Sequence, residues 1–415
     1  MYFFYNIVVI IVGFVLKIVA IFNKKIHLFV QGRKDVFKKL ENCFEFQDMV
    51  IWFHCASLGE FEQGRPIMEN IKIQHPTSKI LVTFFSPSGY EIKKDYAVAD
   101  LVTYLPLDTK NNAKRFLKLV NPKIAIFVKY EFWPNLLREL KAKEIKTILV
   151  SGIFRKEQLF FKGYGNWMKK SLQTFDHFFI QNQSSKELLK QNGFTNTTVS
   201  GDTRFDRVND ITKQDNILKF VEEFSDGNTT LVAGSTWPKC EDLLVDYINT
   251  KANTNQKFII APHIINAKNV LKLKTNISKE SILYSDIIGK KLSSYQVLII
   301  DTIGLLTKIY SYANIAYVGG GFGVGIHNIL EPATFGVPII IGPNYHKFNE
   351  AKELVDLEAC NVVSNNSEFN LALDKLFSNS SRRKNKGIIA RNYIKDNVGA
   401  TDIIVNYLNK TISKN

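Results

Sequence analysis

The sequence predicts an α/β protein with two doubly wound parallel-sheet domains behind an apolar N-terminal helix. Three observations support this prediction. At 415 residues, the chain is too long for one ordinary core and suits two domains of roughly 150–200 residues. Its 45% apolar and 22% charged content is typical of a globular protein. Finally, a pattern of apolar runs separated by amphipathic stretches starts twice along the chain.

The first element is an apolar segment, "YFFYNIVVIIVGFVLKIVAIF", interrupted only by Asn6 and Lys17. No basic residue precedes it and no small-residue cleavage site follows, which disfavours a cleaved signal peptide. It is just long enough to span a bilayer, although Lys17 suits a deep span poorly. Four basic residues follow it: Lys24, Lys25, Arg33 and Lys34. We expect a membrane anchor, spanning or lying in the interface, with the remaining chain cytoplasmic; the alternative is a buried core helix.

The next region alternates strand and helix candidates. The strand candidates are "MVIWFHC", "KILVTFF", "LVTYLPL", "IAIFVKY", "KTILVSG", "HFFIQN" and "NTTVSG". The helix candidates between them include "FEQGRPIMENIKIQ", "TKNNAKRFLKLV" and "WPNLLRELKAKE". The strand candidates are apolar throughout, as expected for strands buried on both faces. This alternation predicts a parallel sheet with crossover helices.

The pattern then restarts with "NTTLVAGSTW", "KFIIAPHI", "QVLIIDT", "NIAYVGGG" and "PIIIGPN". A polar, turn-rich stretch separates the halves, so we place the boundary near residues 205–228. The expected parts are an anchor at 1–24, domains at 25–207 and 208–390, and a basic helical tail at 391–415 that packs back toward the first domain. The two domains are expected to face each other across a cleft, with ligands at the carboxyl ends of their strands.

The charge balance indicates an anionic partner. Lys and Arg number 54 against 39 Asp and Glu, which gives a net charge of +15. Such a surplus suits nucleic acid, a phospholipid surface or a phosphorylated substrate, or serves solubility alone. No basic run interleaved with aromatic residues is present, so nucleic acid is not expected. The four cysteines form no CxxC pair, which predicts neither a disulfide framework nor a zinc site and fits a reducing compartment.

One carboxylate stands at the end of the first strand candidate. In "HCASLGEFEQG", Glu60 directly follows Gly59. A Gly turn here would aim the carboxylate into the predicted cleft. However, Ser57 and Glu60 also have the spacing of a capping box, in which the carboxylate only closes a helix N-terminus. The spacing alone leaves both interpretations open.

A glycine-rich stretch dominates the second half. In "YVGGGFGVGIHNILEPATFGVPIIIGP", a strand ends in Gly319, Gly320 and Gly321, and a helix is expected to begin near His327 or Asn328. Glycines let a phosphate approach the backbone, and a helix N-terminus offers free N–H groups. Glu331, one turn later, can accept both hydroxyls of a ribose. The pattern indicates a nucleotide-sugar site and fits a dinucleotide fingerprint poorly, because that fingerprint follows the first strand.

Polar residues stand at other strand ends too. In the second domain these are Ser235, Thr236 and His263, and in the first domain Ser86, Ser88, Gly89, Lys129 and Glu131. Taken singly, the second-domain residues suit turns or caps as well as ligands. Glu131, in "YEFWP", is also compatible with a structural ion pair to Lys129 or an arginine.

Together these motifs resemble a known family. "SLGEFE", "SPSG", "EFWPN", "AGST", "DTIGLLTKIYSYANIAYVGGGF" and "GIHNILEPA" occur in the order and spacing of 3-deoxy-D-manno-octulosonic acid (Kdo) transferases, over about residues 30–400. The resemblance implies a GT-B glycosyltransferase with two facing Rossmann-like domains. It implies inverting transfer of Kdo from CMP-Kdo to a lipid A precursor of the lipid IVA type, at the cytoplasmic face of the inner membrane. No metal and no cofactor are expected for the transfer.

The resemblance also assigns residues. Glu60 matches the general base, Glu131 a second acid that binds or orients the acceptor, Asn328 a phosphate or sugar contact, Glu331 the ribose contact and Ser235 a phosphate contact. The expected donor site comprises Ser235, Thr236, His263, Gly320, Gly321, Gly325, Asn328 and Glu331. The expected acceptor site comprises Gly59, Ser86, Ser88, Gly89 and Lys129.

Two departures from the family pattern qualify this assignment. "APHIINAKNV" stands where many members have "APRHPER", so His263 replaces an arginine whose bidentate contacts imidazole cannot copy. Lys268 or another basic residue would compensate, or the donor would bind differently. Leu305 replaces an acid in "GLLTKIY". Two rival functions are a GT-B transferase that uses a UDP- or GDP-sugar on another membrane lipid, and a non-catalytic nucleotide-binding or membrane-scaffold protein.

Overall fold

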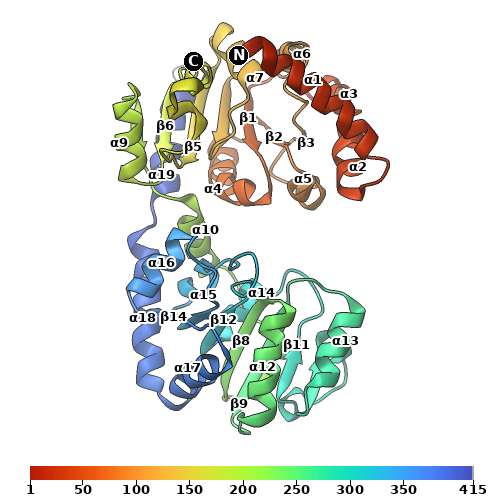
Figure 1. The fold of residues 1–415 in the computed structure, drawn as a ribbon, viewed down its shortest axis with the longest axis vertical. Helices are drawn as coiled ribbons and strands as arrows, with labels where there is room; N and C mark the ends of the chain where they lie inside the picture. The colour runs from red at the N-terminus through yellow and green to blue at the C-terminus, as the bar shows by residue number, and fades with distance from the viewer. Residues whose placement is uncertain (414–415) are drawn as a thin grey trace. The chain divides into compact units, whose positions relative to one another are not determined.

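The structure is a computed structural model that describes residues 1–413. It divides into two compact units, which are considered separately below (Figure 1). The first consists of Met1–Asp206 with Val398–Asn415, and the second of Arg207–Asn397.

The first unit is built on a seven-stranded sheet. Its strands are β1 (Val50–Cys55), β2 (Lys79–Phe84), β3 (Leu101–Tyr104), β4 (Ile124–Val128), β5 (Lys146–Gly152), β6 (His177–Ile180) and β7 (Thr197–Val199). All neighbours are parallel, in the order β3-β2-β1-β4-β5-β6-β7. All seven predicted strands are confirmed. The direction of winding reverses between β1 and β4, and the carboxyl ends of strands at such a point are the usual place for a ligand.

Helices cover both faces of this sheet. They are α1 (Tyr2–Val19), α2 (Lys24–Gln31), α3 (Val36–Cys43), α4 (Leu58–Gln74), α5 (Pro87–Lys93), α6 (Lys110–Val120), α7 (Pro134–Ala142), α8 (Asn166–Leu172), α9 (Gln183–Gln191) and α19 (Ala400–Ile412). Alternate residues of each strand enter opposite cores. Trp52 and Phe127 belong to one apolar cluster, while Ile51 and Ile126 belong to the other. This double burial explains why the strands read as continuous apolar runs.

The second unit repeats the design. Its strands are β8 (Thr229–Thr236), β9 (Gln256–Pro262), β10 (Ser281–Leu283), β11 (Val297–Ile299), β12 (Ile315–Val318), β13 (Ile339–Ile341) and β14 (Cys360–Val362). They form a parallel sheet in the order β10-β11-β9-β8-β12-β13-β14. The five predicted strands are confirmed. The sequence missed β10 and β14, the two edge strands, because each has only three residues and no continuous apolar run.

The helices of the second unit include α11 (Lys219–Ser225), α12 (Pro238–Thr250), α13 (Ala267–Asn276), α14 (Leu306–Ile309), α15 (Leu330–Thr334), α16 (Asn349–Asp356), α17 (Asn366–Ser378) and α18 (Ser380–Asp396). The stretch expected to be polar and turn-rich contains a helix instead, α10 (Thr203–Ile211). Its first residues lie in the first unit and its later residues in the second.

The basic tail consists of two helices. α18 runs through the expected boundary at residue 390 and ends at Asp396, and α19 begins after Gly399, whose φ is 113°. α19 packs in the first unit beside α4, where His75 Nε2 lies 2.9 Å from Asn409 Oδ1. The Asp206 carboxylate accepts hydrogen bonds from the backbone N–H groups of Gly399 and Thr401. These bonds satisfy free donors at the start of the helix.

Candidate active site

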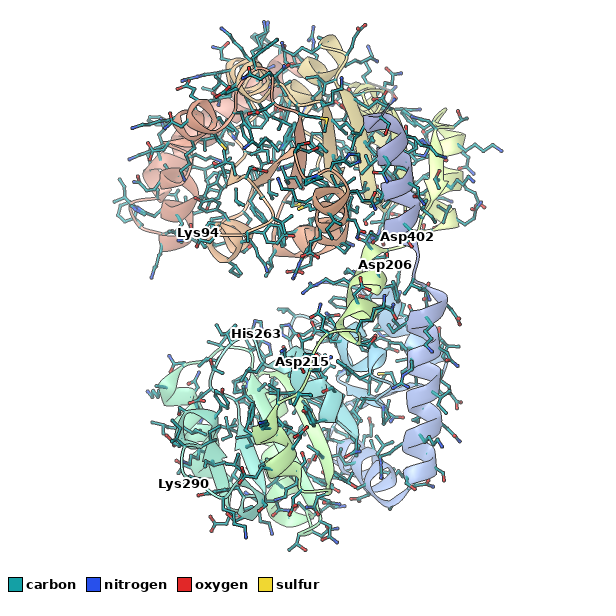
Figure 2. The ribbon with its side chains drawn as sticks, turned by 180° about the vertical axis from the view of Figure 1, so that it is seen from behind. Lys94, Asp206, Asp215, His263, Lys290 and Asp402 are labelled. Carbon is teal, nitrogen blue, oxygen red and sulfur yellow. The ribbon has the colours of Figure 1, made fainter. Side chains whose placement is uncertain are left out.

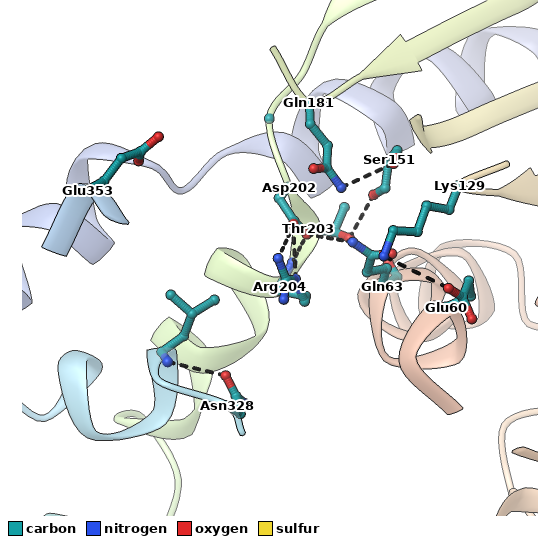
Figure 3. Close-up of polar contacts among 12 residues, drawn as sticks. Glu60, Gln63, Lys129, Ser151, Gln181, Asp202, Thr203, Arg204, Asn328 and Glu353 are labelled. Atoms are coloured by element: carbon teal, nitrogen blue, oxygen red, sulfur yellow. Dashed lines mark hydrogen bonds and ion pairs between the residues drawn. The ribbon is translucent and has the colours of Figure 1, made fainter. Parts of the chain in front are cut away.

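Glu60 lies in the first turn of α4, immediately after β1. Its Oε2 accepts hydrogen bonds from the backbone N–H of Ser57, at 3.1 Å, and from the Ser57 hydroxyl. Its Oε1 lies 3.8 Å from Nζ of Lys129 (Figure 3). The carboxylate is 13% exposed. The capping contact is therefore present, but it occupies only one of the two oxygens.

Gly59 does not form the turn that the sequence suggested. It lies inside α4, and a Cβ built on it would meet only Ser57 Oγ, at 3.8 Å, which is ordinary van der Waals contact. The prediction of a Gly turn is therefore wrong. The orientation of Glu60 comes instead from the start of a helix directly after a strand.

Lys129 has a backbone conformation that few side chains adopt. It follows β4 with a φ of 73°, and its N–H donates to the Val150 carbonyl at 2.9 Å. Non-glycine residues in this region cost of order 1–3 kcal/mol and are concentrated at functional sites. Here the conformation places the ammonium group beside Glu60 (Figure 3).

Glu131 pairs with a buried histidine instead of Lys129. Its Oε2 lies 3.4 Å from Nε2 of His54, a fully buried residue of β1. The indole N–H of Trp133 points at both groups, 3.0 Å from Glu131 Oε2 and 3.1 Å from His54 Nε2. His54 Nδ1 contacts the Thr83 hydroxyl at 2.9 Å. The alternative ion pair of Glu131 with Lys129 is not formed, because Lys129 lies beside Glu60. His54 was not among the residues predicted from the sequence.

The two carboxylates share one environment. Burial raises the pKa of the Cys55 thiol, at the end of β1, and the negative charges of Glu60 and Glu131 raise it further. The adjacent strand β2 leads to Ser86, which caps α5 by accepting from the Ser88 N–H at 3.3 Å. A Cβ on Gly89 would lie 2.3 Å from the Phe84 ring, so glycine is required for α5 to approach β2. The carboxyl ends of β1, β2 and β4 thus carry the predicted first-domain residues.

A polar cluster fixes the body of α4. The Gln63 amide donates to Asp202 Oδ1 at 3.1 Å, and the Thr203 hydroxyl donates to the Gln63 carbonyl (Figure 3). The Arg204 guanidinium bonds the other Asp202 oxygen at 2.9 Å. Burial raises the pKa of Asp202, but the charge and hydrogen bonds of Arg204 lower it by more. The net pKa is therefore below the ordinary value. The helix that carries Glu60 is therefore held at its second turn as well as at its cap.

In the second unit, glycines surround the end of β12. A Cβ on Gly319 would lie 2.1 Å from the Ser235 carbonyl oxygen, so no larger residue fits between β12 and β8. Gly320 has a φ of 92°, and its carbonyl accepts from the Gly323 N–H at 2.9 Å. Gly321 packs on Gly342, and Gly325 has a φ of 144°. Gly319, Gly320, Gly321 and Gly325 are buried, and the exposed backbone of the loop lies at Gly323 and Val324. A glycine-rich loop at a strand end suits a phosphate.

Ser235 and Thr236 differ in their surroundings. Ser235 has a φ of 53° at an irregularity in the pairing of β8 with β9. The Thr236 hydroxyl is buried and donates to Glu241 Oε1 at 3.0 Å. The Thr236 hydroxyl is thus engaged within its own unit, whereas Ser235 is partly buried near the end of β8.

His263 belongs to a stack of three rings. Its ring centroid lies 4.1 Å from that of His327 and 5.0 Å from that of Trp237. The Trp237 indole N–H donates to His327 Nε2 at 2.9 Å. Burial and the neighbouring His263 lower the pKa of His327 to about 4. His263 lies at the surface of this unit (Figure 2), and its pKa is also lowered by burial. No local sequence pattern indicates this stack.

Glu331 is held on both sides. Its Oε1 accepts from the Asn328 amide at 2.9 Å and its Oε2 from the Thr307 hydroxyl at 3.0 Å. Burial raises its pKa, while these hydrogen bonds and Arg207 act in the opposite direction. Asn328 Oδ1 also accepts from the Leu330 N–H at 3.2 Å (Figure 3), so α15 begins at Leu330, later than predicted.

No cluster suited to a metal is seen in the part of the chain that is described: residues 1–413 contain no group of three or more His, Cys, Asp or Glu side chains able to hold an ion.

Comparison with known proteins gives consistent results. Residues 29–207 match the family model described as 3-deoxy-D-manno-octulosonic-acid transferase (kdotransferase). The chain is 31% identical to the 3-deoxy-D-manno-octulosonic acid transferase of Aquifex aeolicus over 348 residues, covering 82% of this chain and 88% of that protein. It is 25% identical to the enzyme of the same name from Rickettsia prowazekii, covering 81% of this chain and 74% of the relative.

Two solved structures share the fold. A UDP-GlcNAc 2-epimerase from Neisseria meningitidis matches with a TM-score of 0.61 and 16% identity, over 88% of this chain and 100% of that one. MurG from Acinetobacter baumannii matches with a TM-score of 0.55 and 14% identity, over 88% and 99%. At such identities the likeness concerns the fold alone. It confirms the predicted GT-B class with two Rossmann-like units.

Proposed function

Because this chain belongs to the Kdo transferase family and is a Kdo glycosyltransferase of lipopolysaccharide synthesis, we propose that it moves Kdo from CMP-Kdo to a phosphorylated lipid A precursor of the lipid IVA type, with inversion. The observation that supports this proposal most directly is the carboxylate of Glu60. One of its oxygens is hydrogen-bonded by Ser57, and the other lies 3.8 Å from the ammonium group of Lys129.

Glu60 serves as the general base in this proposal. The acceptor is a sugar hydroxyl, which is a weak nucleophile until its proton is removed as the new bond forms. Oε1 takes that proton, the acceptor oxygen bonds to the anomeric carbon of Kdo, and the bond from that carbon to the phosphate oxygen breaks. Cytidine monophosphate leaves with the electron pair. The Ser57 contacts hold the carboxylate in place during the transfer.

Glu131 and Lys129 orient the acceptor. Glu131 is immobilised by His54 and Trp133, so its carboxylate offers a fixed acceptor for a sugar hydroxyl. The ammonium group of Lys129 lies beside Glu60 and would attract an anionic acceptor. Ser86, Ser88 and Gly89 supply polar surface at the end of β2, and Gly59 leaves space beside the base.

The second unit binds the donor in this proposal. The phosphate would lie against the glycine-rich loop of Gly320, Gly321 and Gly325 and against Ser235 near the end of β8, and Glu331 would accept the ribose hydroxyls. His263, which stacks with Trp237 and His327, stands where many family members have an arginine. Neutral imidazoles can offer single hydrogen bonds, whereas arginine makes bidentate contacts. Lys268, exposed in the first turn of α13, is the nearest basic residue in sequence to His263.

The leaving group requires only moderate stabilisation. Cytidine monophosphate leaves from a single phosphodiester, and backbone N–H groups with basic side chains can stabilise its developing charge. The proposed reaction therefore uses no metal and no cofactor.

Attachment to the cytoplasmic face of the inner membrane is the cellular part of the proposal. By length and composition α1 could cross a membrane, but it lies along the first unit. The Tyr5 hydroxyl donates to Asp108 Oδ2 at 2.7 Å, and Arg138 lies 5.1 Å above the Tyr2 ring. The opposite side of α1 is exposed and apolar, including Phe3, Phe14 and Ile18. We favour a helix lying in the interface, since spanning would break these contacts.

Incubating the purified protein with CMP-Kdo and a lipid A precursor, and reading the products by mass spectrometry, tests the proposal. A product heavier by Kdo is expected. Failure to transfer Kdo, together with preferential binding of UDP or GDP over CMP in a titration, would favour the rival GT-B transferase.

Deleting residues 1–22 should release the protein from the membrane fraction of cells; an unchanged membrane share would contradict the anchor.

A further inference from the structure

A cavity of about 950 Å³ opens beside α1 within the first unit. Its walls come from the second half of α1, from α2, from the start of α3 and from the loop that precedes α6. The lining includes apolar side chains such as Leu16, Ile21 and Leu107 and the basic residues Lys17, Arg33 and Lys34. No aspartate or glutamate is among the lining residues. The cavity therefore combines apolar surface with an unbalanced positive charge.

Arg33 supplies the fixed part of that charge. Its guanidinium donates to three backbone carbonyls, those of Leu105, Phe29 and Phe85, at 2.7–2.9 Å. It also lies 3.6 Å above the Phe29 ring. Among residues 1–413, none of the ion pairs found includes Arg33. Burying a charge without a counterion is costly, so an anion placed here would be stabilised.

Two surfaces adjoin this cavity. On one side is the exposed apolar face of α1, which we place in the lipid interface. On the other side is Phe85, whose carbonyl accepts from Arg33 and whose ring lies 4.6 Å from the Trp133 ring. The Trp133 indole donates to Glu131 at 3.0 Å. Two side-chain contacts thus connect the basic cavity with the carboxylate that orients the acceptor sugar.

We propose that this cavity binds the phosphate-bearing, acylated end of the lipid acceptor, while the sugar hydroxyl reaches Glu60. The inference rests on the proposed function. Arg33, Lys17 and Lys34 contact the phosphate, and Leu16, Ile21 and Leu107 contact the start of the acyl chains. A phosphorylated glycolipid matches both the charge and the apolar walls, whereas a soluble phosphorylated sugar would leave the apolar walls exposed to water.

The test uses the double variant Lys17→Gln/Lys34→Gln. Both side chains are exposed, so the fold should be retained. The matched control is Lys38→Gln/Lys114→Gln, which removes the same charge from exposed positions of α3 and α6 outside the cavity. We expect the cavity variant to raise KM for the phosphorylated acceptor roughly tenfold or more, as loss of charge-assisted bonds implies, with kcat unchanged. KM for the same acceptor stripped of phosphate should not change.

Equal effects of the two double variants would overturn the proposal, because general attraction to an anionic bilayer depends on charge alone. Binding to phosphatidylcholine vesicles containing phosphatidylglycerol should fall similarly in both variants. If the wild type transfers no Kdo at all, binding of the phosphorylated acceptor in detergent micelles still decides the matter. A loss of affinity in the cavity variant alone would support the site, and unchanged affinity would refute it.

Discussion

The two units use the same architecture for different local chemistry. At the point where the first sheet reverses direction, the ends of β1 and β4 carry Glu60 and Glu131. At the corresponding point of the second sheet, the ends of β8 and β12 carry Ser235 and a run of glycines. The fold thus gives each unit a site in the same place, and the residues after the strands decide what that site can do.

The difference lies in how each unit holds its acidic groups. Within residues 1–413, Oε1 of Glu60 accepts no hydrogen bond from another side chain, and the nearest ammonium group, that of Lys129, is 3.8 Å away. Glu331 has both oxygens hydrogen-bonded by Thr307 and Asn328. A base needs a carboxylate that can accept a proton, whereas recognition of a ribose benefits from one held rigidly. This difference supports the proposal that the first unit provides the base and the second unit binds the donor.

The largest effect is expected from Glu60→Gln. The amide is of the same size but cannot take a proton, so kcat should fall by roughly 10²–10⁴, the range for loss of a general base. Steady-state transfer from CMP-Kdo measures this. If kcat decreased by less than about threefold, Glu60 would not be the base. The proposed difference in role between the two units would then be wrong.

Glu331→Gln should act on binding. Loss of a charged hydrogen-bond acceptor is expected to raise KM for CMP-Kdo by roughly 10–100-fold, with a smaller change in kcat. Glu368→Gln, at the N-terminus of α17, is the control, since that carboxylate accepts from Ser364 and Asn365. If kcat decreased while KM for CMP-Kdo stayed the same, Glu331 would act in the chemical step. Its proposed role in donor binding would then be wrong.

His54→Asn should have a smaller effect, on the acceptor only. Without the imidazole, Glu131 loses a contact 3.4 Å from its carboxylate. We expect kcat/KM for the acceptor to fall about tenfold, the scale of a lost contact to a charged group. KM for CMP-Kdo should stay constant. His177→Asn is a matched control, because His177 lies on β6 and contacts Thr198 at 2.9 Å. Equal losses in both variants would indicate a purely structural role.

The smallest effect concerns stability and pH. The pKa of His327 is lowered to about 4 from 6.5. Below pH 6.5 the unfolded chain therefore gains a proton at this residue that the folded protein accepts only near pH 4. Its contribution to stability is complete above pH 6.5 and is lost as pH falls toward 4. The slope is reduced by solvent screening, because His327 is only partly buried.

Urea unfolding of the wild type and of His327→Asn at several pH values in this window measures that contribution. The variant should lose less stability on acidification than the wild type. Parallel decreases in the two proteins would show that His327 is not the group responsible.

Much of the fold was predictable because most strands are buried on both faces and therefore read as apolar runs. The positions of Glu60, Glu331 and the glycines near Gly320 close to strand ends were predictable, because each belongs to a local motif. Contacts between distant segments were not. The pairing of His54 with Glu131 depends on β1 lying beside β4, and the stack of Trp237 with His327 depends on β8 lying beside β12. Neither neighbour relation follows from residue spacing.

The central claim is that Glu60 is a base and not merely a helix cap, and two variants of the same contact separate these roles. Glu60→Gln keeps an acceptor for Ser57 but removes the base, while Ser57→Ala removes the capping hydroxyl but keeps the base. The decisive measurement is the single-turnover transfer rate of both variants, with their unfolding free energies. If Glu60 is the base, Glu60→Gln should be stable, bind CMP-Kdo and transfer almost nothing, while Ser57→Ala should be less stable but active. If the transfer rate of each variant fell only in proportion to its loss of unfolding free energy, Glu60 would be a helix cap and not the base.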